Sequence, residues 1–240
     1  MGQFQQAIAE LQEILLTQPS ELQVLLTLAK THLEFGRTQL IASFTARAET
    51  SFVDSIKVIL AVVDSSPGFR RIAWKTAADA LFELSRMAAT LTDPAVVAAA
   101  VERIIPLVTC GTQDRLSALL SVQIQLEETS SAGLSGLLHE VTIRAYRYRN
   151  SLGFLDDAAA ASGSYDLAVA LWAYSHRMSS ASKAEDFRKE AVAYMKDAIS
   201  LDPLSNVYWH ALGDLYFLSH PKVAQHAYIK ALELDDKVRT

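Results

Sequence analysis

Apolar residues recur every three or four positions along most of the chain, which is the spacing of one face of an α-helix. Short breaks that contain proline, glycine or small polar residues separate these stripes. The breaks fall at residues 18–19, 36, 65–68, 92–94, 111, 130–133, 161–164, 203 and 219–221. No stretch alternates between apolar and polar residues with turn signals at both ends. The pattern predicts an all-α protein of about a dozen helices without a sheet.

A second regularity is the tetratricopeptide (TPR) pattern, in which a first helix reads W-x-x-L-G-x-x-Y and a second reads A-x-x-x-F-x-x-A before a proline. The clearest first helix contains Trp209, Leu212, Gly213 and Tyr216, and its second helix contains Ala224, Tyr228 and Ala231. Two other segments match the second-helix pattern. One contains Ala7 and Leu11 before Pro19, and the other contains Ala191, Met195 and Ala198 before Pro203. Other first helices are Leu25, Leu28 and Ala29, and Trp74, Ala77, Ala78 and Leu81.

The spacing between these helices supports the repeat interpretation. Ala7 and Leu25 are eighteen residues apart, and so are Ala191 and Trp209. The small residues are expected where two helices of a pair touch, while the large residues fill the space between pairs. We therefore expect a right-handed α-solenoid of antiparallel helix pairs. It would have irregular repeats at 1–110, a helical segment of unassigned repeat phase at 111–162 and two repeats at 163–240.

Two segments near the end of the chain, YWHALG at 208–213 and AQHAYIKAL at 224–232, carry a more specific similarity. They resemble the TPR scaffold subunit of the superkiller complex, although His210 replaces the usual asparagine and Tyr228 the usual phenylalanine. Residues 46–58 and 69–81 are similar to preceding repeats of that family, in the same order. The resemblance covers most of 1–110 and 163–237.

The resemblance implies a non-catalytic scaffold that holds a DExH RNA helicase subunit and two copies of a β-propeller subunit. Such an assembly feeds mRNA to the cytoplasmic exosome for 3′-to-5′ decay. The resemblance therefore implies protein partners and a location in the cytoplasm, or in the cytoplasm and the nucleus. Members of the family are far longer than 240 residues. Because solenoids need capped ends, both ends of this sequence look truncated.

Composition narrows the function classes further. A net charge of −5 disfavours bulk electrostatic capture of nucleic acid, and direct nucleic-acid contact is not expected. The single cysteine, Cys110, excludes an internal disulfide and a thiolate zinc cluster, and we expect it to be a small buried residue. No apolar run reaches the length of a membrane span, and no secretory signal follows Met1.

The sequence holds no recognisable catalytic motif. It has neither a phosphate-binding glycine loop nor a G-x-S-x-G elbow. The pair Gly133 and Gly136 matches a bare G-x-x-G without the context of a KH loop, and an H-E-x-x-H zinc motif starting at His139 fails because Ile143 stands in the second histidine position. We predict no catalytic residue, no cofactor and no metal, and hence no enzyme.

Two clusters allow more than one interpretation. His210, His220 and His226 are better explained as surface and turn residues than as metal ligands. Arg144, Arg147 and Arg149 alternate with tyrosines; RNA contact competes here with a helix C-terminal turn, where cations favour the helix dipole.

Two other functions remain as alternatives. One is a co-chaperone clamp for peptide C-termini, to which Lys30 and Asn206 could contribute, although no repeated Lys and Asn set is present. The other is the repeat domain of a larger enzyme such as a glycosyltransferase, against which the irregular repeat lengths argue.

Overall fold

The computed structural model describes the backbone of residues 2–63, 67–108 and 131–239, and no strand occurs in these ranges. The predicted all-α class is confirmed for this part of the chain. The chain divides into two compact units, Met1–Arg149 and Asn150–Thr240. Each unit is described separately below, and the single superhelix expected across both stays a prediction.

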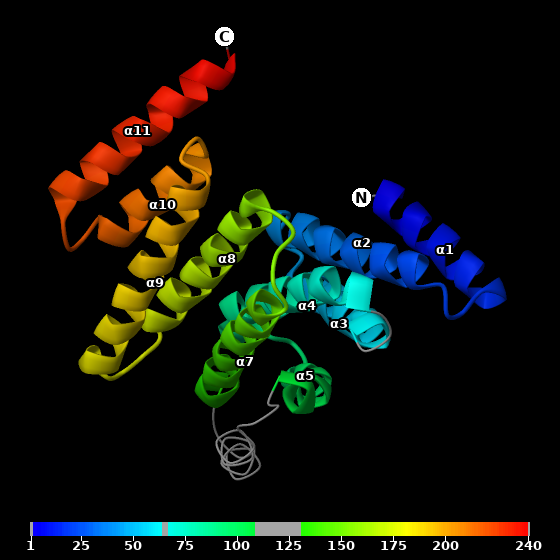
Figure 1. Cartoon of the computed structure of the whole chain (residues 1–240). Coiled ribbons are helices and arrows are strands. Elements are labelled where there is room, and N and C mark those ends of the chain that lie inside the picture. The colour runs from blue at the N-terminus through cyan, green and yellow to red at the C-terminus, as the bar shows by residue number, and fades with distance from the viewer. Residues whose placement is uncertain (1, 64–66, 109–130, 240) are drawn as a thin grey trace. The chain divides into compact units, whose positions relative to one another are not determined.

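Unit 1 is a stack of sequentially packed helices (Figure 1). Its described elements are α1 (Gly2–Thr17), α2 (Leu22–Ile41), α3 (Thr45–Val63), α4 (Pro67–Arg86), the 3₁₀ turn η1 (Ala88–Thr90), α5 (Pro94–Val108) and α7 (Ser131–Ser151). From α1 to α4 each helix packs on the next, and α2 also touches α4 while α3 touches α5. Alternate helices therefore share a layer, as they do in stacked helical hairpins.

The core of unit 1 lies between α2, α3 and α4. Phe52 and Ile56 on α3 and Trp74 on α4 are among its largest fully buried side chains. Small residues bring the helices close together, since Ala29 on α2 is fully buried and its carbonyl accepts a hydrogen bond of 2.8 Å from the Ser55 hydroxyl.

A buried carboxylate ties α3 to the start of α5. Glu49 is 5% exposed and accepts hydrogen bonds from the backbone N–H groups of Thr92, at 2.6 Å, and Asp93, at 2.9 Å. The Asp93 side chain in turn accepts from the N–H of Val96 at 3.2 Å and caps α5. The predicted break at 92–94 is thus a helix start that is held by side chains from two places in the sequence.

The break predicted at Gly36 is wrong, because α2 continues through it to Ile41. A Cβ atom at position 36 would lie 2.5 Å from Cε1 of Phe52, so glycine is needed here for close helix packing and not to end a helix. The helix ends instead at Ile41, two residues before Ser43, which has a φ of 64°. The N–H of Phe44 bonds to the carbonyl of Gln39, and that of Ser43 to Leu40, in a Schellman arrangement.

Unit 2 consists of two helical hairpins, α8 (Asp157–Ser175) with α9 (Ala181–Leu201) and α10 (Asn206–Tyr216) with α11 (Pro221–Arg239) (Figure 1). Side chains cap the first hairpin: Asp156 accepts from the N–H of Ala159 at 2.7 Å, and Ser180 accepts from that of Lys183 at 3.5 Å. The hairpins pack through α9 and α10, and α8 also touches α10.

The break predicted at residues 161–164 is also wrong, since this stretch lies inside α8. Gly163 is buried there, and its carbonyl accepts a hydrogen bond of 3.2 Å from the Asn150 amide. Tight packing therefore explains the small residues in this stretch. The domain boundary placed between 162 and 163 falls within a continuous helix.

Repeat-pattern residues contribute to the core of unit 2. Its central cluster comprises Ala168, Met195, Leu212 and Ala227, and Trp209 and Tyr216 pack against it. On α9, Ala191 and Ala198 are fully buried beside Met195. Trp209 is half-buried, and its indole N–H donates a hydrogen bond of 3.0 Å to the carbonyl of Pro203.

The pattern residues of unit 1 are buried to different degrees. On α4, Trp74, Ala77, Ala78 and Leu81 are all buried, as are Leu28 and Ala29 on α2. Leu25 on α2 is half-buried, like Ala7 and Leu11 on α1, while Pro19 is exposed in the turn after α1. The pattern thus marks the core most clearly at α4.

Candidate interaction site

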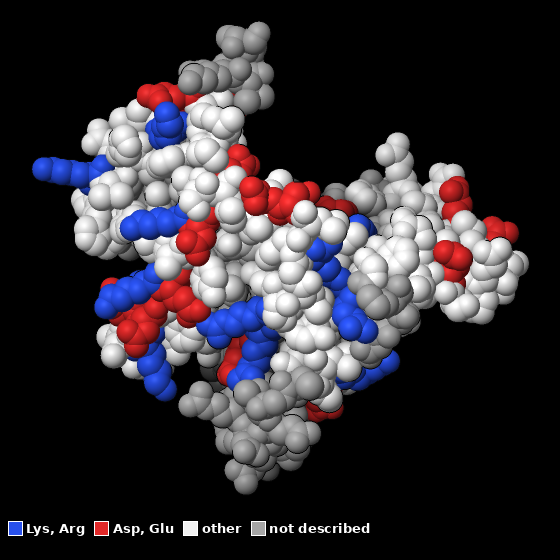
Figure 2. Space-filling view, viewed as in Figure 1, with Lys and Arg blue, Asp and Glu red and all other residues white. Residues whose placement is uncertain are grey.

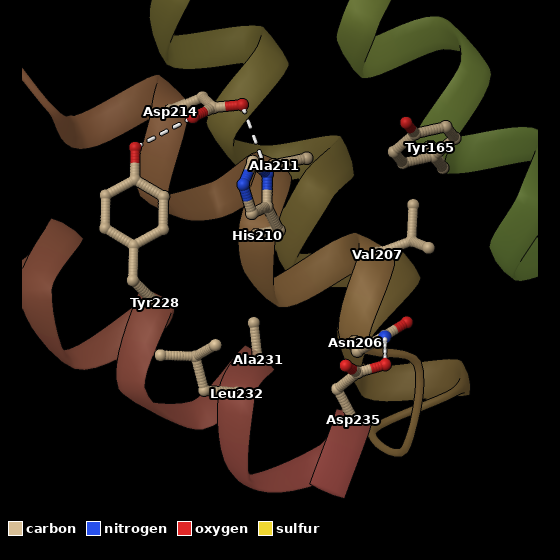
Figure 3. A pocket seen from close by; sticks show the side chains of 10 residues that line it. All are labelled: Tyr165, Asn206, Val207, His210, Ala211, Asp214, Tyr228, Ala231, Leu232 and Asp235. Carbon is tan, nitrogen blue, oxygen red and sulfur yellow. Dashed lines mark hydrogen bonds and ion pairs between the residues drawn. The ribbon is translucent and has the colours of Figure 1, made fainter. Parts of the chain in front are cut away.

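A pocket of about 520 Å³ opens on unit 2 between α10 and α11, with one side chain contributed by α8 (Figure 3). It is lined by Tyr165 of α8, by Asn206, Val207, His210, Ala211 and Asp214 of α10, and by Tyr228, Ala231, Leu232 and Asp235 of α11. The residues on α10 recur at intervals of three or four positions, at 206, 210 and 214 and at 207, 211 and 214, so they lie along one face of that helix.

One end of this α10–α11 pocket is organised around Asp214. Its Oδ1 accepts a hydrogen bond of 2.7 Å from the Tyr228 hydroxyl, and its Oδ2 lies 3.4 Å from Nδ1 of His210. The imidazole meets the Tyr228 ring edge-on, with centroids 5.4 Å apart. Partial burial, together with the bond to Asp214 and its charge, raises the pKa of Tyr228 to about 12, so the phenol stays protonated and donates.

Gly213 makes this geometry possible. A Cβ atom at position 213 would lie 2.4 Å from Cε1 of Tyr228, so only glycine lets the ring rest against α10. The ring is then held where its hydroxyl reaches Asp214, one residue further along α10. The glycine of the repeat pattern therefore shapes the pocket as well as the helix crossing.

At the other end of the pocket, the amide of Asn206 donates a hydrogen bond of 3.2 Å to Oδ1 of Asp235. The middle of the pocket is apolar. There Val207 is 51% exposed and Leu232 is 66% exposed (Figure 3). The pocket thus has a carboxylate at each end and uncovered aliphatic side chains between them.

A second depression, of about 900 Å³, adjoins the α10–α11 pocket on unit 2 and shares Asp214 and Tyr228 with it. The rest of its lining comes from α8, α9, the end of α10 and the turn that follows α10. Trp172 is half-buried and lines it, beside Arg188 of α9. Phe217 and Leu218 form part of its rim and are 61% and 88% exposed. Uncovered apolar surface therefore continues beyond the α10–α11 pocket.

The three histidines singled out in the sequence lie in different places. His210 lines the α10–α11 pocket, His220 lines the second depression, and His226 is exposed on α11. Among the residues that the structure describes, no group of three or more His, Cys, Asp or Glu side chains is placed to hold a metal ion. Cys110 lies outside the described residues.

The arginine and tyrosine run of α7 is largely engaged within unit 1. Arg149 is buried with its guanidinium 5.5 Å from the centre of the Tyr146 ring, and Tyr146 is buried as well. Arg144 forms an ion pair of 2.6 Å with Glu140. Arg147 is exposed. The packing therefore favours the structural interpretation of this run, and RNA contact stays an untested alternative.

The two candidates for a peptide-carboxylate clamp are not suited to that task. Asn206 is hydrogen-bonded to the carboxylate of Asp235, in a pocket that holds a second carboxylate. Lys30 is exposed on α2 of the other unit. A peptide C-terminus in the α10–α11 pocket would meet like charges, so the geometry does not support the clamp.

The surface charge is mixed. On the face seen in Figure 2, basic and acidic side chains over unit 2 lie interspersed, with uncharged surface between them. None of the described helices is long and apolar enough to cross a membrane.

The fold and the pocket define a class: within its described residues, the chain has two all-α units of packed helices, one of which carries an open pocket with an apolar middle. No family model matches the chain, and no curated protein matches it. Among solved structures, the chain is similar to one described as "MamA RS-1 ArsTM double mutant", with 14% sequence identity and a TM-score of 0.36 over 87% of this chain and 95% of that chain. Similarity at this level assigns neither a family nor a function.

The sequence did not point to most of the pocket residues. Asn206, His210 and Asp214 follow one another at intervals of four, a spacing that places them on one helix face. That polar stripe, next to the predicted core stripe of Trp209, Leu212 and Tyr216, is the signal that could have found the pocket.

Proposed function

We propose that this chain is a non-catalytic protein-binding scaffold of the TPR type, whose α10–α11 pocket contacts a partner. The observation that carries this proposal is the apolar surface left uncovered on and around α10 and α11. Uncovered apolar patches of this kind are typical of protein interaction sites. The exposed apolar side chains there are Leu201, Leu204, Val207, Phe217, Leu218, Val223, Ile229 and Leu232.

The finer proposal is that the scaffold belongs to a superkiller complex and holds its DExH helicase and β-propeller subunits. It rests on the sequence resemblance at 208–213 and 224–232. Both segments contribute to the pocket, the first through His210 and Ala211 and the second through Tyr228 and Leu232. A role in exosome-linked mRNA decay would follow from those partners.

Co-purification with matched variants tests both the general proposal of a protein-binding scaffold and the finer proposal of a superkiller complex. The double variant Val207→Ser and Leu232→Ser changes two exposed side chains, so helix content should persist while partner recovery falls. Leu16→Ser on α1 is the control, because Leu16 is 84% exposed and lies in unit 1. Recovery of a DExH helicase and a β-propeller protein supports the finer proposal. Equal recovery of partners by both variants contradicts the pocket assignment.

A further inference from the structure

We infer that the α10–α11 pocket receives an amphipathic helix of a partner protein that carries two arginines seven residues apart with a leucine-sized residue between them. This inference rests on the proposed function, because it names the partner chemistry of the same pocket. It follows from the spacing of the two carboxylates, from the ion pairing of Asp214 and from the apolar middle of the pocket.

The spacing fits two turns of a helix. One end of the pocket is marked by the Asn206–Asp235 bond and the other by the Tyr228–Asp214 bond. Along α10 the two ends are eight residues apart, and along α11 they are seven residues apart. At a rise of 1.5 Å per residue, the two ends of the pocket are about 10–12 Å apart. A partner helix lying along the pocket presents side chains at the same interval when they are seven residues apart, on one face.

The charge of Asp214 favours a cation there. Among the described residues, its ion-pair neighbour is His210, which is 66% exposed at its side chain. The other neighbour, Tyr228, is a neutral donor. A guanidinium can bond to a carboxylate through two N–H groups and stack on an aromatic ring. This end of the pocket offers a carboxylate and aromatic rings together, because Asp214 lies beside the His210 and Tyr228 rings (Figure 3).

The middle of the pocket selects an aliphatic residue. Ala211 and Ala231 are small, and the exposed Val207 and Leu232 flank them (Figure 3). A leucine three or four positions after the first arginine would point into this space from the same face of a partner helix. Burying it would cover apolar surface that is now in water. An acidic peptide is disfavoured, because it would meet a carboxylate at each end.

A second copy of this chain is the competing occupant. Lys189 and Lys196 on α9 are also seven residues apart and exposed, with Val192 between them. The ammonium group of Lys196, however, lies 5.9 Å over the Tyr216 ring within its own unit. The oligomeric state of the chain therefore has to be measured beside partner binding.

The test uses a fluorescent, alanine-rich helical peptide with arginines at two positions seven apart and leucine at the third and fourth positions after the first arginine. One control peptide carries glutamate at both arginine positions. In the other, the second arginine lies five positions after the first, which places it on a different face of the helix. Binding to the full chain is measured by fluorescence anisotropy. We expect only the first peptide to bind measurably, and more weakly as salt increases.

Variants of the chain locate the binding. Asp214→Asn keeps an oxygen that can accept from Tyr228, and both Asp214→Asn and Asp235→Asn should weaken binding about two- to fivefold each. Asp197→Asn is the matched control, since Asp197 is exposed on α9 and lies outside the pocket. It should leave Kd unchanged.

Three outcomes overturn the inference. They are equal binding of the glutamate peptide, equal effects of Asp197→Asn and Asp214→Asn, and a dimer of the chain that Asp214→Asn dissociates. If the arginine peptide fails to bind while the Val207→Ser and Leu232→Ser variant still loses its co-purifying partners, the proposed function stands and this inference alone is wrong.

Discussion

Each unit contains a tyrosine whose hydroxyl donates to an aspartate, but the surroundings of the two bonds differ. In unit 1, Tyr146 donates to Asp79 at 2.8 Å, and both residues are buried. Lys75 and Arg37 also lie 3.3 and 3.7 Å from Asp79. In unit 2, Tyr228 donates to Asp214 at 2.7 Å at the edge of an open pocket. The same bond closes an interior in one unit and shapes a surface in the other.

Two glycines, one in each unit, show the same contrast between a buried interior and an open surface. Gly36 and Gly213 each lie against an aromatic ring of the next helix, at 2.5 and 2.4 Å from the position of a Cβ atom. The ring on Gly36 belongs to Phe52, which is fully buried, whereas the ring on Gly213 belongs to the half-buried Tyr228. A close helix crossing can therefore serve packing alone or can also position a polar group for recognition.

The largest expected difference is between Trp74 in unit 1 and Trp209 in unit 2. Trp74→Ala removes a side chain that is 2% exposed and should cost about 3–5 kcal/mol. Trp209 is half-buried, so Trp209→Ala should cost about 2 kcal/mol. Hydrogen exchange should show faster exchange confined to the unit that carries the change, because each unit is compact and has its own core. Equal losses, or loss throughout both units, would contradict this contrast.

The next test exchanges the two glycines for alanine. Gly36→Ala should destabilise unit 1 by about 1–2 kcal/mol, because the buried Phe52 ring cannot move aside. Gly213→Ala should change the stability of unit 2 by less than about 1 kcal/mol, since Tyr228 can rotate toward solvent and alanine favours the helix. Thermal unfolding followed by circular dichroism measures both. A larger loss for Gly213→Ala would show that the Tyr228 ring is as fixed as Phe52.

A pH titration tests how the surroundings of Tyr228 affect its pKa. The folded pKa of Tyr228 is raised to about 12, above the value of about 10 of an unfolded chain. Its contribution to stability is therefore present below pH about 10 and is lost as the pH rises toward about 12. In Asp214→Asn, the pKa of Tyr228 should fall and this window should narrow, as ultraviolet absorbance would show. An unchanged titration would contradict the role given to Asp214.

The smallest effect is expected at the end of α2. Ser43 has a φ of 64°, a conformation that favours glycine. Ser43→Gly should therefore stabilise unit 1, by less than about 1 kcal/mol because glycine also loses more entropy on folding. Chemical denaturation measures the shift. Ser219→Gly, in the exposed turn after α10, is the control and should not stabilise the chain.

The sequence predicted the helices of both units better than their ends. Stripes such as the one through Ala191, Met195 and Ala198 report burial directly, and these residues are fully buried. Gly36 was misassigned as a helix break because a glycine that ends a helix and one that admits a neighbouring ring look alike in one sequence. The ring of Phe52 is sixteen residues away, and only the tertiary structure brings it to Gly36.

The pocket was harder to predict than the core. Its residues come from α8, α10 and α11, so no local window contains them all. The pattern did include Gly213 and Tyr228, since both belong to the repeat signature. It did not include Asp214 and Asp235, because acidic residues are mostly exposed on protein surfaces, and nothing in the sequence distinguishes these two. The bonds from Tyr228 and Asn206 distinguish these two carboxylates in the structure.

The Glu49 bonds to the start of α5 have a consequence for the order of folding. They join positions 43 and 44 residues apart, whereas the Ser51 hydroxyl reaches Gln39 across only twelve. Closing the longer loop costs more chain entropy, so the α2–α3 hairpin should form before the contact with α5. Loss of the Glu49 carboxylate should then speed the unfolding of unit 1 and leave its folding rate nearly unchanged. The Glu49 bonds would thus form late in folding and prolong the lifetime of folded unit 1 by slowing its unfolding.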